Sequence, residues 1–394
     1  MKKSTIITIL AFALGVVVLS VGFILLTDNN ISRKLFETTT TTTAPEVIPD
    51  AEPMDLWNED ITKYINLGQY KGLNIEVEQT EVAQEYIDSQ IELMLINAKQ
   101  FTEVKEGSIA ENAIFSFDYT GYLVNEDGSK GEKFQGGAST GQLAYIDGTT
   151  LVTISANGLG SFIDGFAQGI LGKKIGETFD IDITFPTNYQ SQELAGKKTI
   201  FEIKLNYIAD TYYTDEWIKE YTEGECNNYE ELENVFRESA QNEIDNTNRD
   251  LVWAQIIKNT TWVQVPEQQF NYMYNALVDE IESYVDYYSY MGYQITFEQM
   301  LQMSGINGID GLKEYTKEFI LSELVVYAVI QAEGLKITDE EYAALISELV
   351  ESTGKTEAEV IEYYGGEDAI KKNMLLDKVD KLVVRENNLI IKEK

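Results

Sequence analysis

The sequence predicts an α+β fold: a small antiparallel β domain with one short helix, joined to an elongated all-helical part, behind an apolar amino-terminal helix. In residues 111–209, apolar and polar residues alternate between glycines, as in strands. From Thr214 onward, apolar residues recur at helical spacing. Thr5–Leu26 holds 22 residues without a charge, close to the roughly 20 that a transmembrane helix needs.

The amino-terminal segment favours an anchor that stays in the membrane over a removed signal peptide. The apolar region of a signal peptide usually has about 7–15 residues, and no small-residue cleavage pattern follows Leu26. Lys2 and Lys3 predict an N-terminus inside and a body outside, although two basic residues on the other flank weaken the asymmetry. We therefore expect a single-pass protein of the cell membrane, anchored through residues 5–26, with an extracytoplasmic body.

The remaining chain divides by composition. Thr38–Thr43 is a run of six threonines, and prolines among acidic residues follow it. Such a stretch is typical of an extended stalk, because it buries no core. The expected organisation is a cytoplasmic tip and anchor at 1–27, a stalk at 28–60, a linker strand and helix packing with the helical domain at 61–110, a β domain at 111–209, and a helical domain at 210–394.

Individual elements follow from the same patterns. Leu73–Val77 predicts a short strand and Thr80–Lys99 a helix. Capping-box patterns begin at Asn228, Thr338 and Thr356. Gly334 and Gly354 indicate helix ends. The β domain is expected to hold strands at Ile114–Tyr119, Asp180–Phe185 and Thr199–Ile208 and one helix at Gly160–Leu171.

Composition excludes many kinds of site. The chain has no histidine and one cysteine, Cys226, which excludes Ser–His–Asp and Cys–His catalysis, an internal disulfide and Cys/His zinc sites. The formal net charge of −36 repels phosphate backbones, so we expect no nucleic-acid partner. A carboxylate cation site at Asn125–Glu132 is left open, but Asp127-Gly128 favours a hairpin turn there. We expect no metal and no other cofactor.

Peptidyl-prolyl isomerisation needs neither imidazole nor thiol. Its barrier of about 18–20 kcal/mol comes from amide resonance. An enzyme therefore needs only to hold the proline ring, exclude water and stabilise the twisted amide, with aromatic walls and one or two hydrogen-bond donors. Aromatic residues of a small β domain are more often core than site. The candidates are Phe117, Tyr119, Phe134, Phe162, Phe166, Tyr189 and Phe201.

Five motifs occur in order within about 90 residues of the β domain. They are DYTGY at 118–122, EKFQGG at 132–137, GSFIDGF at 160–166, ILG at 170–172 and FPTNYQSQELAGK at 185–197. Together they resemble the FKBP-type peptidyl-prolyl isomerase domain, in the version carried by trigger factor. The resemblance implies an FKBP-like half-barrel sheet wrapped on one short helix, with a proline pocket between them.

The resemblance also implies residue roles. The backbone N–H of the position matched by Ile163 donates to the substrate carbonyl, Phe166 takes the pocket floor, and the Tyr189 hydroxyl faces the ligand. The implied catalytic residues are Tyr119, Phe134, Phe162, Ile163, Phe166, Tyr189 and Phe201.

Two features depart from the family pattern. Gln135 stands where an acid usually follows the pocket phenylalanine, and we expect it to contact substrate at the rim. Residues 138–160 carry extra sequence where the family has a compact strand. Both changes predict a reshaped pocket mouth and weak isomerase activity.

The flanks share the resemblance, which covers about residues 68–394. Tyr70–Val77 is similar to the trigger factor linker, and residues 214–394 to its chaperone domain. The ribosome-docking domain of that family has no counterpart here, so no ribosome is expected as a partner. Residues 270–303 are rich in tyrosine, phenylalanine and methionine, which suit contact with unfolded chains but equally suit helix–helix packing. The expected client contacts are Tyr284, Tyr288 and Met291.

The sequence thus predicts a membrane-anchored, extracytoplasmic isomerase and chaperone. Its expected partners are unfolded or nascent secreted polypeptides and their prolyl peptide bonds. A non-catalytic holdase, whose FKBP-like domain only binds, is the alternative. A stalked surface-binding or adhesion protein that reuses the scaffold is a third interpretation.

Overall fold

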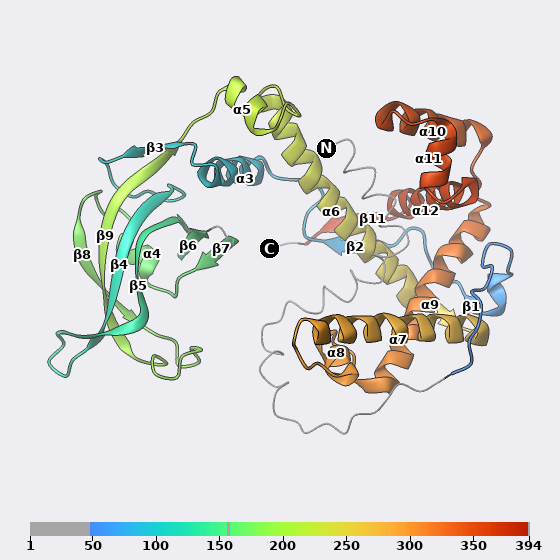
Figure 1. Cartoon of the computed structure of the whole chain (residues 1–394), viewed down its shortest axis with the longest axis horizontal. Helices are drawn as coiled ribbons and strands as arrows, with labels where there is room; N and C mark the ends of the chain where they lie inside the picture. The colour runs from blue at the N-terminus through green and yellow to red at the C-terminus, as the bar shows by residue number, and fades with distance from the viewer. Residues whose placement is uncertain (1–47, 156–157, 393–394) are drawn as a thin grey trace. The chain divides into compact units, whose positions relative to one another are not determined.

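A computed structural model describes residues 48–155 and 158–392 of the chain (Figure 1). The predicted anchor, at residues 5–26, and the threonine run lie outside these residues. Within them, no helix combines the length and the apolarity needed to cross a membrane. The described chain forms two compact units, which we call the sheet unit, Val82–Ala240, and the helical unit, residues 48–81 with 241–392.

The sheet unit is built on one antiparallel sheet, with strand order β3-β9-β4-β5-β6-β7 and β8 paired to β9. Alternating burial along β8 and β9 confirms the period-2 pattern of the sequence. Its strands are β3 (Phe101–Val104), β4 (Phe115–Val124), β5 (Lys130–Asp147), β6 (Thr150–Ser155), β7 (Gly158–Ser161), β8 (Thr178–Thr184) and β9 (Lys198–Thr211).

The turn between β4 and β5 is the predicted hairpin turn. Gly128 N–H donates to Asn125 O at 2.9 Å, and Gly128 has φ 85°. That left-handed conformation explains the glycine, because a Cβ would be strained there.

The one helix of the β domain is shorter than the sequence predicts. α4 spans only Phe166–Ile170, whereas Gly160–Leu171 was expected. Gly158–Ser161 forms strand β7 instead. Gly165 precedes the helix with φ 103°, and its φ lies outside the range of a helical residue, so the helix begins just after it. The extra residues at 138–160 therefore form part of β5, all of β6 and the start of β7.

Each face of the sheet carries its own cluster. On one face α4 packs over buried residues that include Phe115, Phe117 and Leu205. On the other face the end of α3 (Gln84–Asn97) packs through Ile96 against Ala209. α3 also packs with α5 (Asp215–Tyr221) and the first turns of α6 (Tyr229–Asn259).

The helical unit has a separate core. Buried residues from α6, α9 and α12 meet there with the short chain before β2. Its helices are η1 (Ile61–Lys63), the later part of α6, α7 (Glu267–Tyr290), α8 (Phe297–Met303), α9 (Gly308–Glu333), α10 (Asp339–Thr353), α11 (Glu357–Tyr363) and α12 (Glu367–Arg385), and its strands are β1 (Ile65–Asn66), β2 (Asn74–Val77), β10 (Thr261–Trp262) and β11 (Asn388–Ile391).

Two boundaries differ from the sequence prediction. The stalk was expected to reach residue 60, but Leu56 is 2% exposed in the helical core, and Met54 N–H donates to Gln269 Oε1 at 2.9 Å. The strand and helix at 61–110 were expected to pack with a helical domain that begins at residue 210. β2 does pair with β11, and α3 packs with α5 and the first turns of α6. The division between the two compact units, however, falls within α6, after Ala240, and not at residue 210.

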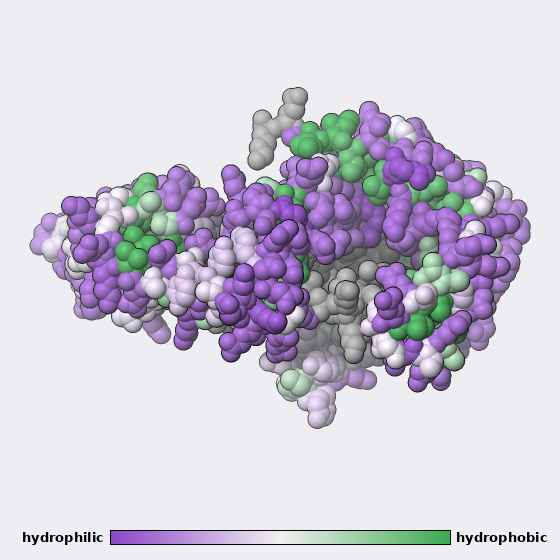
Figure 2. Space-filling model, turned by 90° about the horizontal axis from the view of Figure 1, so that it is seen from above, coloured by the Kyte–Doolittle hydropathy of each residue, from purple (hydrophilic) through white to green (hydrophobic). Residues whose placement is uncertain are grey.

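Helix ends were predicted well. The capping boxes at Thr338 and Thr356 form, and Gly334 and Gly354 end α9 and α10 in the left-handed conformation. A further capping box, between Thr296 and Gln299, was not predicted although glutamine also fits the pattern. The face seen in Figure 2 is mostly hydrophilic, with scattered apolar patches.

Candidate functional site

The aromatic residues predicted for the pocket lie together around Phe201, near the start of β9. Ring centroids of Phe166, Phe134 and Tyr119 lie 4.7, 5.7 and 6.2 Å from that of Phe201. Phe162 joins the group through Phe166, at 4.5 Å. These separations fall within the range in which aromatic pairs attract each other beyond simple burial.

Burial divides the cluster into a floor and walls. Phe166 and Phe201 are 1% and 3% exposed, so they form a fixed apolar floor. The partly buried residues around them, which we call the walls, are Tyr119, Phe134, Phe162, Ile163 and Tyr189. We use the name aromatic pocket for this cluster of side chains, namely the walls, the floor residues and Phe185. Phe117, by contrast, is fully buried beneath them, so it is a core residue.

Two motif glycines hold Phe134 in place. A Cβ on Gly121 would lie 2.5 Å from Phe134 Cζ, and a Cβ on Gly137 would lie 2.5 Å from Phe134 Cε2. Side chains at these positions would therefore displace the ring. The glycines of the DYTGY and EKFQGG motifs are therefore required because the Phe134 ring occupies the space that a side chain would need.

A backbone donor lies at the mouth of the short helix. Phe162 N–H donates to Leu151 O at 2.9 Å, which fixes the entry to α4. The next amide, of the half-buried Ile163, has no acceptor among the described residues. A carbonyl oxygen placed over the aromatic floor could accept its hydrogen bond. This is the amide that the resemblance assigns to the substrate carbonyl.

The loop between β8 and β9 closes on the carbonyl of Pro186. That oxygen accepts from the N–H groups of Tyr189, at 3.1 Å, and Gly196, at 3.2 Å. The turn places the Tyr189 ring 4.6 Å from Phe185. Phe185 is 5% exposed and also lies against Phe134, so it is a pocket residue that the sequence interpretation had treated only as part of the loop.

The electrostatics of the pocket involve tyrosine alone. Burial raises the pKa of Tyr119, and the neighbouring Tyr189 hydroxyl adds to the effect. Tyr119 therefore stays neutral throughout the physiological range and can donate a hydrogen bond. With no histidine in the chain, the pocket offers a ligand an apolar shape and hydrogen-bonding groups.

Gln135 is the one predicted pocket residue outside the ring cluster. It is exposed, next to Gly136, which has φ 77°. It therefore lies on the surface, adjacent in sequence to Phe134.

The predicted client-binding stretch, 270–303, divides into packed and exposed parts. Phe270, Tyr274 and Phe297 pack between α7, α8 and α9, as the helix–helix alternative expects. At the end of α7, Tyr284 and Met291 are 49% and 56% exposed. We define the tyrosine tip as Tyr284, Tyr287, Tyr288, Tyr290, Met291 and Tyr293.

The tyrosine tip brings the three predicted client contacts together with further aromatic rings. Tyr288 is half-buried, with its ring 5.7 Å from Tyr287 and 6.3 Å from Tyr293. No lysine or arginine occurs between Lys258 and Lys313. The tip is therefore an apolar and acidic surface.

Comparison with known proteins gives two family matches. Residues 105–206 match the model of the FKBP-type peptidyl-prolyl cis-trans isomerase. Residues 227–385 match the bacterial trigger factor protein C-terminus. All the predicted pocket residues fall within the first match, and the tyrosine tip falls within the second.

Curated relatives agree with these matches. The trigger factor of Macrococcus caseolyticus is 28% identical over 337 residues, covering 82% of this chain and 72% of the relative. The trigger factors of Clostridioides difficile and Bacillus subtilis are each 27% identical, covering 80% and 81% of this chain and 70% and 72% of their own lengths.

A solved structure described as "Promiscuous Substrate Recognition in Folding and Assembly Activities of the Trigger Factor Chaperone" aligns with 89% of this chain and 79% of its own, at 15% identity and a TM-score of 0.32.

Proposed function

We propose that this trigger factor-like chain, with its FKBP-type domain and its trigger factor C-terminal domain, is a membrane-anchored isomerase and chaperone that assists the folding of secreted proteins outside the cytoplasm. The chain is a peptidyl-prolyl isomerase and a trigger factor-like chaperone. What we propose is the role of the site residues, the membrane anchor and the extracytoplasmic placement.

The observation that supports the site assignment is the aromatic pocket with its backbone donor. On this proposal a proline ring packs on Phe166 and Phe201, and the walls exclude water from the amide. Ile163 N–H then donates to the substrate carbonyl. Because a twisted amide loses resonance, an apolar and water-free site that grips the ring favours it over both planar forms.

The tyrosine tip supports the chaperone part of the proposal. Tyrosine offers a large apolar surface with a polar end, and methionine adapts its shape to different partners. Gathered at the end of α7, exposed or half-buried, they suit transient contact with many unfolded sequences. Tyr284, Tyr288 and Met291 are the proposed contacts.

The anchor rests on sequence alone. The uncharged stretch Thr5–Leu26 is long enough to span a bilayer, and Lys2 and Lys3 favour an N-terminus inside. The threonine run that follows would hold the folded units a short distance from the membrane.

Isomerisation of a Phe-Pro peptide by the full chain in detergent tests the site. The Tyr119→Ala, Phe166→Ala double variant is expected to lower kcat/KM by about tenfold or more, an effect of roughly 1.4 kcal/mol or larger. Tyr207→Ala is the matched control, since Tyr207 packs on the opposite face of the same sheet. Circular dichroism checks that the variants fold.

Background rates for the unaltered chain and the double variant alike would contradict the catalytic assignment and favour the holdase alternative. Loss of activity in Tyr207→Ala as large as in the double variant would show that the effect is a general one on folding.

Protease added to intact cells tests the topology. The body is expected to be digested while the cells stay sealed, and a cytoplasmic protein serves as the control. Protection of the body until the membrane is broken would contradict the extracytoplasmic placement.

A further inference from the structure

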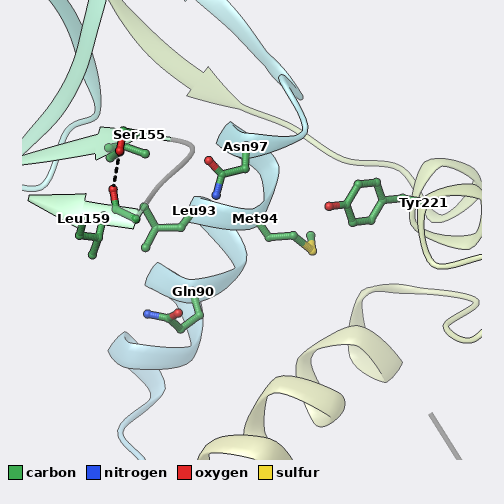
Figure 3. Close-up of a pocket in the computed structure, with 9 residues that line it drawn as sticks. Gln90, Leu93, Met94, Asn97, Ser155, Leu159 and Tyr221 are labelled. Carbon is green, nitrogen blue, oxygen red and sulfur yellow. Dashed lines mark hydrogen bonds between the residues drawn. The ribbon is translucent and has the colours of Figure 1, made fainter. Parts of the chain in front are cut away.

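A second recognition surface lies on the sheet unit, on the face opposite the aromatic pocket. Gln90, Leu93, Met94 and Asn97 follow the i, i+3, i+4, i+7 spacing of one helix face on α3. They form the base of an open groove of about 390 Å³ (Figure 3). Ser155 at the end of β6 and Gly158 at the start of β7 bound it on one side.

The walls of the groove are apolar and exposed. Leu159 of β7 is 54% exposed, and Tyr221 of α5 is 48% exposed. Tyr221 stacks on Trp217 with ring centroids 4.7 Å apart, so its ring is held at the edge of the groove. In Figure 3, Met94 points away from α3 toward Tyr221, while Leu93 lies on the side of β7.

The polar groups of the groove are neutral. Gln90 and Asn97 present side-chain amides, and no charged side chain lines the groove. Amides flanking apolar side chains suit a polypeptide, whose backbone both donates and accepts hydrogen bonds. They are a poor match to a small charged ligand, which would need a counter-charge.

Strand β7 adds a row of backbone groups beside the groove. It is the last strand of the sheet and, among the described strands, pairs with β6 alone. Phe162 N–H donates to Leu151 O in the continuation of this pairing. In an antiparallel ladder, the backbone groups of alternate residues point toward the partner strand. The N–H and C=O groups of Gly158 and Gly160 therefore point toward β6, and those of Leu159 and Ser161 point outward. Such an edge is a template for an added strand.

The charges around the groove favour a basic partner. α3 carries Glu85, Asp88 and Glu92 and no basic residue. α5 carries three acids against Lys219. Lysine or arginine next to the bound apolar side chain would be attracted by this field.

We propose that β7 and this groove form a second binding site for unfolded polypeptide. An extended segment adds to the edge of β7 and places an apolar side chain over Leu93 and Met94, with lysine or arginine flanking it. This inference rests on the proposed chaperone function and deepens it. Because β7 leads directly into Phe162 and Ile163, a segment bound there keeps neighbouring prolyl bonds of the same client near the aromatic pocket, which raises their effective concentration.

A proline-free peptide tests the site without involving the aromatic pocket. The probe is a fluorescein-labelled peptide of about a dozen residues, alternating valine and threonine with a lysine at each end, matched to an edge strand and the groove. It is titrated by fluorescence anisotropy into the full chain in detergent. We expect Leu159→Asp and Asn97→Trp each to weaken binding by about fivefold or more, since one removes an apolar wall and the other fills the groove.

The opposite edge of the same sheet provides the control. Val104→Asp alters β3, where Val104 is 37% exposed, and should leave the affinity within about twofold because surface substitutions away from a site have small effects. In ¹³C-methyl methionine spectra, Met94 is expected to shift on peptide addition. An equal loss of affinity in Val104→Asp, or none in the two groove variants, would overturn the site.

The same spectra separate this inference from the proposed function. Shifts of Met291 and Met303 without a shift of Met94 would leave the chaperone proposal intact and overturn only the groove. Absence of any binding by the unaltered chain would overturn both.

Discussion

The aromatic pocket of the sheet unit and the tyrosine tip of the helical unit use similar side chains in opposite environments. In the pocket, Phe201 is 3% exposed and meets the rings of Phe134 and Phe166. At the tip, Tyr290 is 89% exposed and Tyr287 58%. Mutual burial fixes ring positions, as a site for one chemical group requires, whereas exposure leaves side chains free to adapt to many partners.

The largest expected contrast comes from truncating the centre of the pocket. Phe201→Ala should destabilise the sheet unit by about 3–5 kcal/mol, because it empties a buried site surrounded by other rings. Isomerase activity should fall with it. Tyr290→Ala is the control, with an expected change below about 0.5 kcal/mol. Chemical denaturation followed by tyrosine and tryptophan fluorescence measures the free energy of unfolding of both variants. Equal losses of stability would contradict the contrast between the pocket and the tip.

A smaller change tests whether the pocket depends on ring position. Gly137→Ala places a Cβ 2.5 Å from Phe134 Cε2, so it should cost about 1–3 kcal/mol by overpacking and lower kcat/KM by displacing the wall.

Gly136→Ala is the neighbouring control for that substitution. Gly136 has φ 77°, but nothing lies within 4 Å of its added Cβ. Gly136→Ala should lower the free energy of unfolding by about 1–2 kcal/mol through backbone strain. It should leave kcat/KM for isomerisation unchanged. A loss of activity in Gly136→Ala as large as in Gly137→Ala would show that loop strain, and not the position of Phe134, controls the pocket.

The sequence predicted the pocket better than it predicted the elements beside it. Tyr119, Phe134, Phe166 and Phe201 were identified by local motifs whose glycines are needed within the motif itself. Gln135 is exposed beside Phe134, and its contact with substrate stays a prediction. The left-handed turn at Gly136 is a feature that a resemblance between side chains does not specify.

The elements that were missed depend on partners far away in the sequence. β2 was predicted at Leu73–Val77, but β11, which pairs with it across more than 300 residues, was not. β11 has only four residues, too few for a pattern to show. The stretch at Gly158–Ser161 has three small residues, and it becomes a strand because β6 lies beside it. Likewise Leu56 is buried by helices that follow it by some 200 residues.

The pH dependence of the pocket provides a third test. Burial raises the pKa of Tyr119 above its usual value of 10.0, so its neutral form is favoured in the folded state. Its contribution to stability is then present below pH 10 and is lost as the pH rises through the folded pKa. We expect kcat/KM to be flat between about pH 6 and 9, where a histidine-dependent site would titrate. A rate profile in a series of buffers measures this.

Tyr119→Phe is the matched variant for the pH test. It should leave the profile flat below pH 9 and remove the decline expected at more alkaline pH. An inflection near neutral pH in either protein would show that another titrating group takes part in the reaction.

The smallest effect on stability is expected at the tyrosine tip. Tyr284→Ser, Tyr288→Ser and Met291→Ser should each change the free energy of unfolding by about 0.5 kcal/mol or less, because each removes an exposed or half-buried side chain. Together they should reduce the suppression of client aggregation several-fold, measured by light scattering. Tyr363→Ser, at a tyrosine of α11 that is 57% exposed outside the tip, should leave suppression intact. A loss of about 2 kcal/mol or more in the free energy of unfolding at the tip would instead favour a role in helix–helix packing. The aromatic residues of both units would then stabilise the fold.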